Sequence, residues 1–171
     1  MTHPSSTAVA IAIRPAGPDD APALARLRFQ FRAGLDAAQE PEGAFIQRCT
    51  EWMREHLSRL DSWRCWVAED AGTIRGMAWL LTLEKLPNPI AEPERHGYVS
   101  SLYVEPALRS GGIGSRLLDQ CLRECRARSC DAVFLWPSPR SRSLYLRHGF
   151  AVRDDLMELR LSAPPAHGGA A

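Results

Sequence analysis

Residues 102–115, with the sequence LYVEPALRSGGIGS, carry the strongest structural signal in this chain. A short apolar run ends at a proline, and a loop with one arginine and three glycines then opens an amphipathic helix. The first backbone N–H groups of a helix lack partners inside it, and the aligned peptide dipoles leave partial positive charge there. Glycine lets that backbone approach an anion closely, and Arg109 adds a planar cationic donor. The segment therefore predicts a phosphate-binding loop between a strand and a helix.

Three kinds of glycine-rich loop bind phosphates, and they differ in spacing. The nucleotide-hydrolase P-loop needs a lysine before Ser or Thr, but Lys85 is the only lysine in the chain. The dinucleotide fingerprint needs a third glycine where Leu117 stands. The acyl-CoA loop has the pattern Arg/Gln-x-x-Gly-x-Gly/Ala after a strand, and residues 109–114 match it at every defined position. A tight turn that only caps a helix is the alternative to all three.

A second motif lies about 30 residues further along the chain. Residues 143–150, SLYLRHGF, have a Leu-Tyr-x-x-x-Gly-Phe pattern in which a helix ends at glycine and a strand starts at the aromatic residue. With both motifs in this order, the chain resembles the GNAT superfamily of acyl-CoA-dependent N-acyltransferases. The resemblance covers most of residues 9–161.

The resemblance implies acetyl-CoA as the co-substrate and assigns roles to particular residues. Tyr145 takes the family's position beside the CoA sulfur as general acid, and the backbone N–H of Leu102 polarises the thioester carbonyl. Ser138 stands where many relatives carry an asparagine that bonds the pantetheine. The residues expected to bind the co-substrate are Leu102, Tyr103, Val104, Arg109, Ser110, Gly111, Gly112, Ile113, Gly114, Ser115, Ser138 and Tyr145.

The general base is open at this stage. Family members often use a carboxylate or histidine on the fourth strand, but here that strand offers Tyr98, Ser100 and Ser101, with His96 just before it. Glu84, at the end of the third strand, is a weak candidate. A water chain, or an amine that arrives neutral, would also serve.

Periodicity and turn residues predict the order β-α-α-β-β-β-α-β-α-β-β, which agrees with an α/β (α+β) GNAT fold of about seven strands in a mixed sheet with helices on both faces. We expect one domain over residues 8–161, with disordered segments at 1–7 and 162–171. Gly76 inside its strand marks a bulge or a close backbone approach. The expected strands are 8–14, 63–69, 73–83, 96–104, 132–136, 150–152 and 156–161, and the expected helices are 20–33, 45–60, 112–129 and 141–147.

Composition bears on which binding partners and which cellular compartment to expect. The chain has 171 residues and a net charge of +1, so no strong attraction to nucleic acid or an anionic membrane is expected. No run of 18 apolar residues and no signal pattern is present, and the five cysteines form no obvious disulfide framework, which together predict a cytoplasmic protein. Cys121 and Cys125 fall on the apolar face of a helix, so we expect no metal site.

The function expected from these residues is transfer of an acetyl group to a primary amine of a small molecule or peptide. Glu84, Glu92 and Glu94 in a proline-rich loop would favour a cationic amine, although a solvated charged loop explains them equally well. A non-catalytic acyl-CoA-binding sensor and a donor longer than acetyl are alternatives. Homodimers are frequent in the family, and the residues leave that question open.

Overall fold

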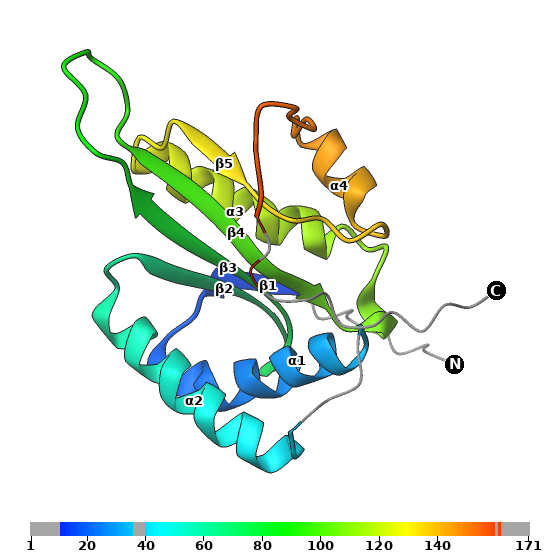
Figure 1. Ribbon diagram of the computed structural model, residues 1–171. Coiled ribbons are helices and arrows are strands. Elements are labelled where there is room, and N and C mark those ends of the chain that lie inside the picture. Colours follow the sequence, from blue (N-terminus) through cyan, green and yellow to red (C-terminus); the bar gives the residue numbers. More distant parts are fainter. Residues whose placement is uncertain (1–10, 36–39, 160, 162–171) are drawn as a thin grey trace, which may run out of the picture. The chain divides into compact units, whose positions relative to one another are not determined.

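The computed structural model describes residues 11–35, 40–159 and 161, which fall into two compact units divided between Trp136 and Pro137 (Figure 1). The first unit contains a five-stranded sheet in the order β1-β2-β3-β4-β5. Neighbours from β1 to β4 are antiparallel, and β5 runs parallel to β4, so the predicted mixed sheet is confirmed. The strands are β1 (Ala12–Pro15), β2 (Trp63–Asp70), β3 (Thr73–Glu84), β4 (Arg95–Val104) and β5 (Ala132–Phe134).

Helices cover both faces of this sheet, with α1 (Ala21–Ala33) and α2 (Glu42–Arg59) on one face and α3 (Ile113–Ala127) on the other (Figure 1). Side chains alternate along β3, so Met77 and Trp79 join the core beneath α1 and α2. Gly76 instead lies against Leu117 of α3. The predicted α/β fold with helices on both faces is therefore confirmed. Two 3₁₀ turns, η1 (Pro18–Asp20) and η2 (Pro106–Leu108), precede α1 and follow β4.

Two glycines allow the sheet to pack closely. A Cβ on Gly76 would lie 3.0 Å from the carbonyl oxygen of Tyr103, and the β2–β3 register shifts beside it, between Ala68 and Glu69. The prediction of a bulge or close approach at Gly76 is thus confirmed. A Cβ on Gly97 would lie 2.6 Å from the Sγ of Cys125, so α3 packs directly on the backbone of β4.

The strand count differs from the prediction of about seven. The five strands of the first unit are all that the described residues contain, and the expected closing hairpin, 150–152 with 156–161, is absent from them. Leu156, Met157 and Leu159 are exposed. Apolar alternation predicts one buried face of a strand, but a strand forms only where a partner supplies the ladder hydrogen bonds and covers that face.

The second unit contains α4 (Arg142–Arg147), which ends before Gly149 at a φ of +85°. The expected single domain, 8–161, spans both units. The first strand begins at Ala12 within the described residues, and residues 8–10 of the expected strand lie outside them. The expected terminal segments, 1–7 and 162–171, lie outside the described residues. No helix in the part of the chain described above has the length and apolar character needed to cross a bilayer.

Candidate functional site

The loop between β4 and α3 presents a row of unpaired backbone donors. Ser110 and Gly112 have φ angles of +69° and +75°, and such left-handed residues turn successive N–H groups toward one side of a loop. Within the described residues, no N–H group from Ser110 to Ser115 donates a hydrogen bond, and the first helical bond runs from the N–H of Arg116 to the carbonyl oxygen of Gly112. These donors stand at the N-terminus of α3, where an anion of phosphate type could be held.

Arg109 braces this loop. Its Nε donates to the carbonyl oxygen of Val104 at 2.8 Å, and its guanidinium carbon lies 5.6 Å from the centre of the Tyr103 ring. The two terminal nitrogens of Arg109 make no hydrogen bond to any residue that the structure describes. At the loop's start, Arg75 of β3 pairs with Glu105 at 2.9 Å. The loop is therefore fixed to the sheet at both β3 and β4, while the terminal nitrogens of Arg109 can meet an anion.

A bulge interrupts β4 just before the loop. Ser101 has a φ of +53°, and the register passes from Tyr103 opposite Met77 to Ser100 opposite Trp79. Leu102 consequently has no register partner on β3, and the pairing of β4 with β5 covers only residues 96–98. The backbone N–H that was expected to act on the thioester thus lies in the part of β4 that leaves the regular ladder.

Arg28 of α1 was not singled out from the sequence, yet it contacts this bulge. One of its terminal nitrogens donates to the Oγ of Ser101 at 2.9 Å, and that oxygen lies 3.3 Å from the Oγ of Ser100. Burial lowers the pKa of the Arg28 guanidinium. A signal did exist, because Arg28 lies four residues after Leu24 and three after Ala25 and so falls on the buried stripe of its helix.

Glu84, the weak candidate for the base, is placed elsewhere. Its side chain is 81% exposed, and it pairs with Arg95 at 3.8 Å across the first position of β4. Leu102 is seven residues along that strand, which corresponds to roughly 23 Å. The acidic loop lies at this same end, where Glu92 accepts a hydrogen bond from Lys85 at 3.1 Å. The structure therefore does not bring Glu84 or the loop's charges to the bulge.

The two remaining predicted site residues lie in the second unit. The Oγ of Ser138 is 2.9 Å from the Oγ of Ser141, the residue before α4, and also accepts the N–H of Ser141 at 3.3 Å. Ser138 therefore helps to begin the helix that carries Tyr145. The Tyr145 ring is buried and meets the edge of the Phe150 ring, with centroids 5.7 Å apart. This contact aligns the phenol through packing.

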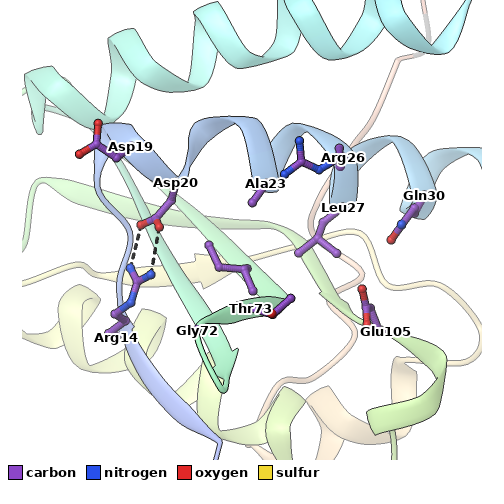
Figure 2. Close-up of a pocket in the computed structure, with 11 residues that line it drawn as sticks. Arg14, Asp19, Asp20, Ala23, Arg26, Leu27, Gln30, Gly72, Thr73 and Glu105 are labelled. Carbon is purple, nitrogen blue, oxygen red and sulfur yellow. Dashed lines mark hydrogen bonds and ion pairs between the residues drawn. The ribbon is translucent and has the colours of Figure 1, made fainter.

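A hollow of about 350 Å³ lies beside α1 and the β2–β3 turn (Figure 2). Arg14, one of its lining residues, bonds Asp20 at 2.7 Å and Glu69 at 2.5 Å. Figure 2 shows the Arg14 and Asp20 side chains facing each other as an ion pair. None of the predicted site residues lines this hollow, so we do not assign it to the candidate site.

The cysteines behave as apolar core residues. Cys121 and Cys125 are buried beneath α3, as predicted, and burial raises the pKa of the Cys125 thiol to about 12. Burial also raises the pKa of the Cys121 thiol. Among the residues that the structure describes, no group of three or more His, Cys, Asp or Glu side chains could hold a metal ion.

Comparison with known proteins agrees with this geometry. A predicted acetyltransferase from Clostridium acetobutylicum, solved with acetyl-CoA, is 26% identical with a TM-score of 0.73 over 89% of this chain and 97% of that one. A GCN5-related N-acetyltransferase from Ralstonia eutropha is 25% identical, with a TM-score of 0.71 over 90% of this chain and all (100%) of that one. A glucosamine-6-phosphate N-acetyltransferase from Arabidopsis thaliana shares the fold at 18% identity, with a TM-score of 0.66 over 90% and 99% of the two chains.

No curated protein matches the chain. The family model described as acetyltransferase (GNAT) family matches residues 32–150, which include the β4 bulge, the glycine-rich loop and the Tyr145 motif. The chain therefore belongs to the GNAT acetyltransferase family.

Proposed function

We propose that this protein is an N-acetyltransferase that moves an acetyl group from acetyl-CoA to a primary amine by direct attack in a ternary complex. The observation that supports this most strongly is the row of unpaired N–H groups from Ser110 to Ser115 at the start of α3. Those donors match a diphosphate, and the relative from C. acetobutylicum, at 26% identity, was solved with acetyl-CoA.

In this proposal, different residues bind the co-substrate, stabilise the oxyanion and donate the proton. The 110–115 loop and Arg109 hold the diphosphate, and backbone groups of residues 102–104 line the pantetheine arm. The N–H of Leu102 stabilises the negative charge that develops on the thioester oxygen, a contribution of about 3 kcal/mol for a well-placed donor. The amine nitrogen bonds to the carbonyl carbon, the C–S bond breaks, and Tyr145 donates its phenolic proton to the departing thiolate.

The amine enters this scheme as the neutral base. Strand β4 carries no carboxylate between Arg95 and Val104. Glu84, the last residue of β3, lies opposite Arg95, at the end of β4 far from Leu102. After attack, the nitrogen releases its proton to water near the Ser100 and Ser101 hydroxyls. The rate should therefore rise with pH as the acceptor amine deprotonates.

The test combines binding and turnover. Titration calorimetry with CoA should give a 1:1 complex, and thiol release from acetyl-CoA should depend on an added amine. The decisive variant is Gly112→Ala, with Gly72→Ala as a matched control. The two glycines have φ angles of +75° and +77°, and a Cβ on either would meet no atom within 4 Å. Because the two changes impose equal backbone strain, strain alone would affect both variants alike. We expect a loss of CoA affinity in Gly112→Ala only, which would come from the loop.

The outcomes separate the candidates. If calorimetry detects no heat of CoA binding to the wild-type protein, the proposal is refuted altogether. CoA binding without amine-dependent thiol release, unaltered by Tyr145→Phe, would instead identify a non-catalytic acyl-CoA sensor. Faster turnover with a longer acyl-CoA would replace acetyl as the donor and leave the rest of the scheme in place.

A further inference from the structure

We infer that the acceptor amine carries an anionic group, a carboxylate or a phosphate, which Arg28 binds beside the β4 bulge; this rests on the proposed function and specifies its substrate class. Sequence patterning pointed the other way, toward a cationic amine attracted by Glu84, Glu92 and Glu94. In the structure, that acidic loop is remote from the bulge and partly neutralised by Lys85 and Arg95.

The first argument comes from how half-buried arginines are paired. Four of them bond a carboxylate, and they are Arg14, Arg64, Arg75 and Arg128. In the described residues only two half-buried arginines, Arg28 and Arg109, lack such a partner. A partly buried guanidinium loses hydration and needs an anion to offset that cost. In the proposed function Arg109 binds the diphosphate, which leaves Arg28 as the one half-buried arginine of the described residues without an anionic partner.

The second argument is that Arg28 has hydrogen-bond donors left over. Its guanidinium carbon lies 5.8 Å from the centre of the Phe31 ring, but in the described residues its one hydrogen-bond partner is the neutral hydroxyl of Ser101, which is also 3.3 Å from the hydroxyl of Ser100. A partly buried donor without an acceptor is costly. A ligand group made only of acceptor oxygens would satisfy this surplus, whereas an ammonium would add to it.

The third argument is position. Arg28 bonds Ser101, the residue immediately before Leu102. An anion held by the Arg28 fork therefore places the remainder of a small acceptor next to the proposed oxyanion donor. The nearby positive charge also disfavours protonation of the acceptor nitrogen, which suits a reaction that needs the neutral amine. A compact molecule with an amine and an anion a few bonds apart, such as an amino acid or an aminoalkyl phosphate, fits these requirements.

The experiment compares acceptors in pairs that differ only in the anion. Phosphoethanolamine is set against ethanolamine, and a set of amino acids against their amides, with thiol release from acetyl-CoA as the readout. The anionic member should be the better substrate. Arg28→Met should lower its kcat/KM by about tenfold to a hundredfold, mainly through KM. The same variant should leave the neutral partner within about twofold, and Arg28→Lys should recover part of the loss.

Arg26→Met, an exposed position on the same helix, is the control and should behave like the wild type. Calorimetry on the CoA-saturated protein with the same acceptors reads binding whether or not turnover follows. A heat of binding with the anionic acceptors that disappears in Arg28→Met supports the inference. Equal binding in Arg28→Met, tighter binding of neutral or polycationic amines, or no heat with any anionic amine overturns it. Because CoA binding is measured first, failure here is distinct from failure of the proposed function.

Discussion

Tyr145 combines two roles that a single substitution can separate. Its ring packs against Phe150, and its hydroxyl is the proposed acid. Tyr145→Phe keeps the ring and removes only the proton donor, so kcat should fall by about a hundredfold while the KM for acetyl-CoA and the unfolding midpoint stay unchanged. Steady-state kinetics and circular dichroism on the same preparations would measure this. An unaltered kcat would remove Tyr145 from the mechanism.

Single residues also show where sequence reasoning reaches its limit. Gly112 could be predicted, because an anion loop needs a residue that tolerates positive φ and glycine is the residue that does. Ser101 could not, because its φ of +53° follows from a register shift against β3 that local sequence does not encode. Arg28 was hidden for a different reason: it is one of 20 arginines, and its importance appears only when its missing carboxylate partner is visible.

At the scale of elements, α3 packs directly on the backbone of β4 at Gly97. The Cβ of Gly97→Ala would come within 2.6 Å of the Cys125 Sγ, so α3 would have to shift. We expect a loss of about 1–3 kcal/mol in the free energy of unfolding, measured in urea. Gly43→Ala on α2, where a Cβ meets nothing within 4 Å, should cost nothing. If the thiol is the obstacle, adding Cys125→Ala should reduce the loss more than additivity allows.

Arg14 joins β1, η1 and β2 through Asp20 and Glu69, and this junction should depend on pH. The hydrogen bond from Arg14, helped by the N–H of Gly17, holds the pKa of Asp20 below its ordinary value. A carboxyl with a depressed folded pKa stabilises the protein above its unfolded pKa, about 3.9, and loses that contribution as pH falls through the folded value. Asp20→Asn should therefore cost about 1 kcal/mol at pH 7, and in urea titrations the difference from wild type should begin to shrink below about pH 4 and vanish only below the depressed folded pKa. A difference that does not shrink as the pH falls below about 4 would show that the cost is steric.

Across the whole molecule, motif order predicted more than periodicity did. The glycine loop and the Leu-Tyr-x-x-x-Gly-Phe segment identified the family, and with it the mixed sheet and its two helical layers. Alternation at residues 156–161 predicted strands that the described residues lack, because apolar spacing reports a capacity for burial and not the presence of a partner strand. The acidic loop suggested a cationic acceptor for a related reason, since the sequence shows the loop's charges but not their distance from the site.

The proposed co-substrate and acceptor sites should also be separable through the stability of the intact chain. A ligand that binds only the folded state at 100 times its Kd adds about 2.7 kcal/mol, which for a protein of this size raises the unfolding midpoint by roughly 5–10 °C. CoA should produce that rise in wild type, Gly72→Ala and Arg28→Met, and much less in Gly112→Ala. Phosphoethanolamine added to the CoA complex should raise the midpoint further in wild type but not in Arg28→Met. Equal loss of the CoA effect in Gly72→Ala and Gly112→Ala would mean that backbone strain, and not the anion contact, governs binding.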